Sequence, residues 1–150
     1  MAVFRYRMQN VLNVKEKMED QAKAEFAEAM AVLNAEEEKL AALVARREWY
    51  EEEGRRMRRE AIDVSELRDN TRALDNLKEQ IEAQKQNVAA AQAGVDRARN
   101  NLNTAMQERK IQEKLKENAF DEFVRELNAA ESKEIDELVS YRHGLKVQNK

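Results

Sequence analysis

Few side chains in this 150-residue sequence are of the kinds that perform catalysis or hold metals. There is one histidine, His143, and there is no cysteine, which excludes thiolate chemistry, disulfides and Cys/His metal sites. We expect His143, beside Gly144 near the C-terminus, to be solvated rather than to act as a base or metal ligand. The sequence also contains no glycine-rich phosphate loop and no nucleophile elbow. We therefore predict a protein that is not an enzyme and that uses no cofactor or metal.

Two groups of basic residues could bind an anionic partner. They are Arg55, Arg56, Arg58 and Arg59, and then Arg109, Lys110, Lys114 and Lys116. Both groups are interleaved with acids and the sequence pI is about 5.5, whereas phosphate binding usually needs a continuous positive face, so we predict no nucleic-acid partner. Two interpretations of the first group stay open. The arginines could complement the negative end of a helix dipole, or they could form a basic patch with Trp49 and Tyr50 for an acidic partner.

The composition predicts long helices rather than a globular core. Charged residues make up 38% of the chain and aromatic residues only 5%, so little bulky apolar material is available for a deep interior. With no proline and three glycines, the chain has little turn chemistry for sheets or loop-built sites. Disorder is the rival interpretation. The net charge of −3 and the periodic apolar residues favour an ordered coiled coil.

The sequence contains no segment typical of secretion or of membrane insertion. Residues 1–8 lack the continuous apolar stretch of a signal peptide. No apolar run approaches the roughly 20 residues that span a bilayer, and no helix face is both strongly basic and opposed to a strongly apolar one. We therefore expect an intracellular protein.

The residues from Ile62 to Leu67 carry the signature of a helix start and predict the corner of a helical hairpin. With Asp63 as the N-cap, its carboxylate can accept a hydrogen bond from the backbone N–H of Glu66, and Glu66 can reach back to the N–H of Asp63. Ile62 and Leu67 would then form a hydrophobic staple across the first turn. Ser65 is a competing N-cap.

The run before the corner carries the alternating three- and four-residue spacing of a coiled-coil seam. From Phe26 the predicted seam continues through Ala29, Leu33, Glu36, Leu40, Leu43, Arg47, Tyr50, Gly54 and Met57. Before Phe26 it follows Phe4, Met8, Val11, Lys15, Met18 and Ala22. The spacing from Lys15 to Phe26 is then an eleven-residue stutter, which locally unwinds a supercoil.

The run after the corner keeps heptad spacing up to Ala105. Its seam residues are Leu67, Asn70, Leu74, Leu77, Ile81, Gln84, Val88, Ala91, Val95, Ala98, Leu102 and Ala105. Arg109 and Gln112 come next and are poor seam residues, so we predict that the contact moves to other positions. These are Ile111, Leu115, Ala119, Phe123, Leu127, Ala130 and Leu138.

Antiparallel pairing of the two runs would place both irregularities at the same level. It would also place Phe4 near Phe123, with Tyr6 and Phe120 close by, and leave residues beyond about 125 without a partner in the first run. We predict an all-α protein, monomeric when alone, that forms one long antiparallel two-helix coiled-coil hairpin domain over residues 1–150. The predicted parts are a helix at about 3–60, a corner at about 61–66, a helix at about 67–142 and a frayed tail at 143–150. Glu and Lys pairs on its surface would each support the helices by a few tenths of a kcal/mol.

The two ends of the sequence are less generic than its middle. The first carries Phe4-Arg5-Tyr6-Arg7-Met8-Gln9, Val11-Leu12, Val14-Lys15 and Glu19, and the second carries Glu108-Arg109-Lys110, Glu113-Lys114-Leu115, Phe120, Glu131 and Asp136-Glu137-Leu138. In order and spacing these residues resemble the FliJ family of flagellar export proteins, over essentially the whole chain. The resemblance implies an antiparallel coiled coil similar to the central stalk of rotary ATPases. Such proteins bind and activate the hexameric flagellar export ATPase, connect it to the membrane protein of the export gate, and interact with export chaperones at the cytoplasmic face of the cell membrane.

Candidate contact residues follow from this resemblance. For the end that faces the ATPase they are Arg5, Arg7, Arg109, Asp136, Glu137 and Arg142. For the export gate they are Ala73, Leu77, Gln80 and Gln84. The charges could instead only solvate helix ends, and Leu77 is also a predicted seam residue.

Two alternatives of other kinds stay open. One is a structural coiled-coil spacer that self-associates into an extended homodimer. The other is the equivalent stalk of a virulence type III secretion system, which is physically the same machine; the opening Phe4 to Gln9 favours the flagellar branch.

Overall fold

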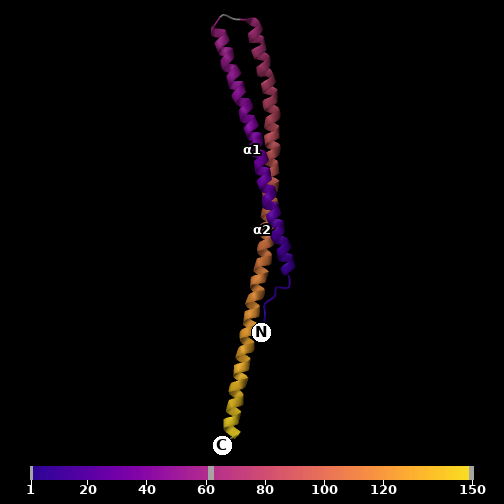
Figure 1. The fold of residues 1–150 in the computed structure, drawn as a ribbon, viewed down its shortest axis with the longest axis vertical. Helices are drawn as coiled ribbons and strands as arrows, with labels where there is room; N and C mark the ends of the chain where they lie inside the picture. Colours follow the sequence, from indigo (N-terminus) through magenta and orange to yellow (C-terminus); the bar gives the residue numbers. More distant parts are fainter. Residues whose placement is uncertain (1, 61–62, 149–150) are drawn as a thin grey trace. The chain divides into compact units, whose positions relative to one another are not determined.

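A computed structural model of the chain describes residues 2–60 and 63–148, with side-chain surroundings up to residue 145. Over these residues the regular secondary structure consists of two helices, α1 (Gln9–Arg59) and α2 (Val64–Gln148). The helices pack against each other along antiparallel directions, which confirms the predicted all-α hairpin (Figure 1).

The chain forms two compact units, and each contains part of both helices. The hairpin unit is Asp20–Asn103, in which α1 and α2 lie side by side (Figure 1). The terminal unit combines Met1–Glu19 with Thr104–Lys150. In it, the N-terminal segment and the first turns of α1 lie along α2, which continues well past them (Figure 1).

Asp63 is the N-cap of α2, as predicted, but with a different partner. Its Oδ1 accepts a hydrogen bond from the backbone N–H of Ser65 at 2.9 Å rather than from that of Glu66, and its carbonyl accepts the N–H of Leu67 at 3.1 Å. The helix begins one residue after Asp63, so the N–H of Ser65 is an otherwise unpaired N2 donor that a cap side chain can reach. Ile62, half of the predicted staple, lies outside the described residues.

α1 begins later, and α2 ends later, than the sequence predicted. Residues 2–6 are not helical, and the N–H of Gln9 donates to the carbonyl of Tyr6 at 3.1 Å in a turn that precedes α1. This extended segment carries the Phe4 ring to α2, where it lies 5.2 Å from that of Phe120. At the other end α2 runs through the segment predicted to fray. Gly144 costs helix propensity there, about 1 kcal/mol, but the chain has no proline to end the helix.

The seam of α1 is continuous, so the predicted stutter is wrong. Glu19 is only 4% exposed, whereas Met8, Val11 and Met18 are 41%, 36% and 46% exposed. A buried or half-buried residue stands at each of the positions Leu12, Lys15, Glu19, Ala22, Phe26, Ala29, Leu33, Glu36 and Leu40. These positions alternate by three and four residues throughout.

The seam of α2 also keeps its heptads beyond Ala105. Ile111 and Leu115 are 58% and 44% exposed, so the predicted move of the contact to these residues is wrong. The half-buried positions after Ala105 include Arg109, Gln112, Lys116, Ala119 and Phe123. The stutter predicted in α1 and the change of contact predicted in α2 are therefore both absent. In their place the heptad seam continues, with polar residues at several of its positions.

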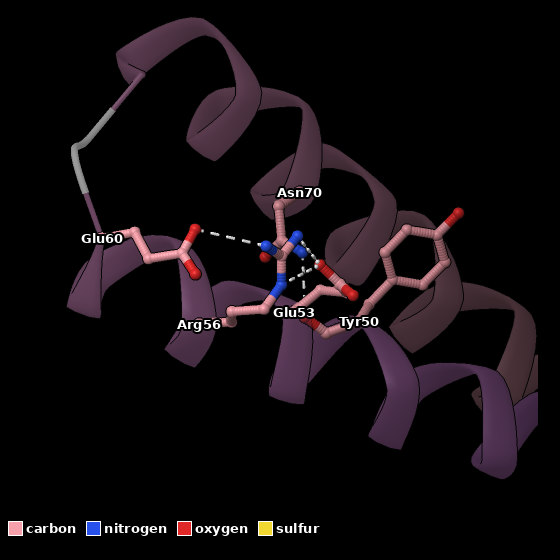
Figure 2. Close-up of polar contacts among 5 residues, drawn as sticks. All are labelled: Tyr50, Glu53, Arg56, Glu60 and Asn70. Carbon is pink, nitrogen blue, oxygen red and sulfur yellow. Dashed lines mark hydrogen bonds and ion pairs between the residues drawn. The ribbon is translucent and has the colours of Figure 1, made fainter.

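Near the corner, Asn70 is a buried polar residue of the seam. Asn70 is 4% exposed, and its Nδ2 donates to the carbonyl of Tyr50 at 2.8 Å (Figure 2). Gly54 makes room for it, since a Cβ atom at this position would lie 2.8 Å from Asn70 Oδ1. The glycine therefore serves the close approach of α2 to α1.

The relation between Gly54 and Asn70 can be tested by a double-mutant cycle. Asn70→Ala should lower the free energy of unfolding by about 1 kcal/mol, the net contribution of a typical hydrogen bond. In that background Gly54→Ala should be stabilising, by up to about 1 kcal/mol, because alanine is the better helix former. In the wild-type chain Gly54→Ala should raise the free energy of unfolding by less, because the added Cβ atom forces the Asn70 amide to move. Urea unfolding followed by circular dichroism measures all three variants, and strictly additive effects would contradict the packing relation.

Candidate functional site

In the terminal unit, charged side chains occupy seam positions and pair across the helices. Lys15 Nζ lies 3.0 Å from Glu108 Oε2. Arg109 donates from Nε to the buried Glu19 carboxylate and from Nη1 to Glu113 at 2.7 Å. The hydrogen bond that Arg109 donates to Glu19, followed by the one that it donates to Glu113, raises the pKa of the Arg109 guanidinium. Arg109 is therefore held in the contact between α1 and α2 as a permanent cation.

An aromatic cluster lies beside these pairs. Phe4 packs against Phe120 at 5.2 Å and Phe123 at 5.6 Å between ring centroids, which confirms the predicted neighbourhood. Tyr6 makes a polar contact here, donating from its hydroxyl to Gln112 Oε1 at 2.9 Å. Both contacts tie the non-helical N-terminal segment to α2.

The predicted ATPase-facing residues fall into two kinds. Arg5 and Arg7 are exposed and stand next to the anchored Phe4 and Tyr6. Arg109 is 22% exposed and is committed to its two glutamates. The remaining three lie on the exposed last turns of α2: Asp136, Glu137 and Arg142. In the terminal unit Arg5 and Arg7 are therefore accessible to a partner, whereas Arg109 pairs with glutamates of the same unit.

Among residues 2–60 and 63–148, no second helix packs on the C-terminal part of α2. Every residue from 128 to 145 is exposed, which confirms the prediction for residues beyond about 125. Among them are the apolar Ile135, Leu138 and Val139, at 60%, 59% and 60% exposure, whose spacing places them on one side of the helix. This segment is an accessible amphipathic surface.

The predicted gate residues in the hairpin unit are mostly packed. Leu77 and Gln84 are 3% and 8% exposed, Ala73 is half-buried and Gln80 is exposed. Gln84 Nε2 donates to the backbone carbonyl of Glu36 at 2.9 Å and also to its carboxylate. The side-chain hydrogen bond from Gln84 lowers the pKa of the Glu36 carboxyl. Of the four predicted residues, Gln80 is the one with an exposed side chain.

Three of the four arginines at the end of α1 pair with glutamates of α1 or with Glu60, which directly follows it. The pairs are Arg55–Glu52 at 2.9 Å, Arg56–Glu53 at 2.6 Å, Arg56–Glu60 at 3.4 Å and Arg59–Glu52 at 3.4 Å. Figure 2 shows Arg56 between its two glutamates. The helix-end interpretation of this group is therefore favoured over a free basic patch.

In the part of the chain that the structure describes, no three or more histidine, aspartate or glutamate side chains are grouped so that they could hold a metal ion. Over the same residues, neither α1 nor α2 contains a stretch apolar and long enough to cross a membrane.

The antiparallel helices with their polar seam define a coiled-coil hairpin protein. The family model of the flagellar FliJ protein matches residues 4–148, and the chain belongs to this family. It is accordingly a component of a type III protein export apparatus, in a family of structural components not known as enzymes.

Among solved structures, the chain resembles CT670 of Chlamydia trachomatis, which is described as a YscO homologue. The TM-score is 0.76 at 24% sequence identity, with 99% of this chain and 100% of that chain covered. At this identity the likeness supports the fold. No curated protein sequence matches the chain.

The contact between Gln84 and Glu36 predicts a measurable pH effect. Because the folded pKa of Glu36 is depressed, its stabilising contribution is present above the ordinary glutamate pKa and is lost as the pH falls through the folded value. Gln84→Ala should move the pKa of Glu36 up toward the ordinary value and reduce this acid-dependent loss. An NMR titration of the Glu36 carboxyl carbon checks the shift, with Gln80→Ala as the control. An unchanged Glu36 pKa in Gln84→Ala would contradict the assigned cause.

Proposed function

We propose that this protein is the coiled-coil stalk of a flagellar export apparatus, which binds and activates the hexameric export ATPase. In this proposal it also links the ATPase to the export gate and to export chaperones, as a monomer at the cytoplasmic face of the cell membrane. The family assignment supports the apparatus. The contacts with individual partners are inferred from the surfaces described above.

The proposal rests on a contrast within the terminal unit between charged residues that pair with each other and residues that are exposed to solvent. Arg109 pairs with Glu19 and Glu113, and Lys15 pairs with Glu108. Residues 128–145 of α2, by contrast, expose their apolar and charged side chains to solvent, and Arg5 and Arg7 are exposed beside the aromatic cluster. An apolar helix side flanked by charges is suited to a protein interface. We therefore assign ATPase binding to Arg5, Arg7 and the last turns of α2, including Asp136, Glu137 and Arg142.

For the export gate we propose a contact centred on Gln80. Leu77 and Gln84 are buried in the hairpin unit, so substitutions there would act through helix packing. Ala73 is half-buried and could contribute a small part of its surface.

The stalk of a virulence type III secretion system is the second candidate. The fold shared with a protein described as a YscO homologue favours it, whereas the family match favours the flagellar system. A self-associated extended spacer is less well supported, because the seam residues find their partners within one chain.

The proposal is tested by the turnover of the cognate export ATPase with and without this protein. We expect stimulation by the wild-type chain. Arg5→Glu/Arg7→Glu should weaken ATPase binding roughly tenfold, since reversal turns two attractive rim charges into repulsive ones, with unchanged helicity by circular dichroism. The matched control is Arg46→Glu/Arg68→Glu, which makes the same charge change at exposed positions of the hairpin unit and should bind normally. Absence of both stimulation and co-purification with the wild-type chain would refute the proposal.

A further inference from the structure

We propose that a groove near the corner of the hairpin unit binds a partner-protein segment in which an arginine or lysine stands next to an apolar residue. This tip groove has a volume of about 420 Å³. Its lining includes Trp49, Tyr50 and Met57 of α1 and Glu66, Asp69 and Ala73 of α2. Of the gate candidates only Ala73 belongs to it, and the site does not depend on the proposed ATPase contact.

Trp49 gives the groove an aromatic surface that a cation can use. The residue is 59% exposed although it is large and apolar. The Tyr50 ring meets it edge-on at 4.9 Å between centroids and an interplanar angle of 87°, so the indole is supported while much of it stays accessible. Indole is the best aromatic partner for a guanidinium or ammonium group, and its apolar surface also suits the apolar neighbour of that cation.

The charges of the lining favour a cation. Asp69 and Glu66 form no ion pair with any residue in 2–60 or 63–148. Arg56 also lines the groove, but Glu53 at 2.6 Å and Glu60 at 3.4 Å already hold its guanidinium (Figure 2). Glu66 also attracts the Arg56 guanidinium, more weakly than Glu53 and Glu60 do. The lining still holds three carboxylates, those of Glu53, Glu66 and Asp69, against the one guanidinium of Arg56, and this excess of negative charge favours a cationic ligand.

The groove is preformed rather than assembled by a ligand. Asn70, another of its lining residues, is fixed by its hydrogen bond to the Tyr50 carbonyl at 2.8 Å, and α2 approaches α1 closely at Gly54. Binding to a fixed surface loses less conformational entropy than binding that must order the site. The same carboxylates would repel phosphate groups, which disfavours a nucleic acid as the occupant.

Trp49 is the only tryptophan of the chain, so its emission reports on the groove directly. The probe is an acetylated, amidated peptide with two Leu-Arg steps separated by glycine, titrated into the full-length protein at low salt. The comparison peptide carries glutamine in place of arginine. The test variant is Glu66→Gln/Asp69→Asn, and the matched control is Glu38→Gln/Glu79→Gln, which removes two exposed carboxylates elsewhere in the hairpin unit.

We expect a saturable change in emission with half-saturation below about 1 mM. Affinity should fall about fivefold in Glu66→Gln/Asp69→Asn and stay nearly unchanged in Glu38→Gln/Glu79→Gln. Circular dichroism must show equal helicity for all chains. The proposal is overturned if the arginine peptide leaves the emission unchanged, if the glutamine peptide binds equally well, or if the control variant loses as much affinity. It is also overturned if sedimentation shows that the free chain dimerises and that Trp49→Ala abolishes this, since a second copy would then be the occupant.

Discussion

Polar residues inside the seam must find partners across it, and this constraint fixes how α1 and α2 pair. Asn70, Gln84 and Glu19 are each less than 9% exposed, and each makes its hydrogen bond with the facing helix. A shift of one heptad would still bring apolar positions together but would leave these groups buried and unpaired, which costs more than a hydrogen bond contributes. The leucine and alanine contacts supply cohesion, whereas the polar residues specify the register.

The sequence was sufficient to predict the helices, their antiparallel pairing and the aromatic neighbours of Phe4, because heptad spacing and the cap at Asp63 are local signals. The seam positions predicted from the sequence were wrong where an apolar residue stands next to a polar residue that occupies the seam. Met18 and Ile111 look like seam residues by type, yet Glu19 and Arg109 occupy the seam because each neutralises the other. The four- and three-residue steps from Lys15 to Glu19 and from Glu19 to Ala22 would have predicted the correct seam. They are missed when only apolar residues are assigned to seam positions. The tip groove needs residues of both helices and could not be located before their register was known.

The same pairing separates structural charges from available ones. Arg109 pairs with glutamates within the chain, and so do Arg55, Arg56 and Arg59 at the end of α1, so their positive charge in the sequence overstates what a partner meets. Arg5, Arg7 and the last turns of α2 remain accessible. For a member of the FliJ family, partner binding would then rest on the parts of the chain that the helix pair does not itself use.

The register of the hairpin unit is tested most directly by a disulfide between Gly54→Cys and Asn70→Cys. The chain has no other cysteine, and an ideal Cβ at residue 54 lies 3.6 Å from Asn70 Cγ, close enough for a disulfide once each side chain is a thiol. Oxidation of the dilute protein should give a cross-linked monomer, whereas Arg47→Cys/Asn70→Cys, shifted by one heptad, should not link. Cross-linked dimers, or equal linking of the shifted pair, would contradict the register and the fold within one chain.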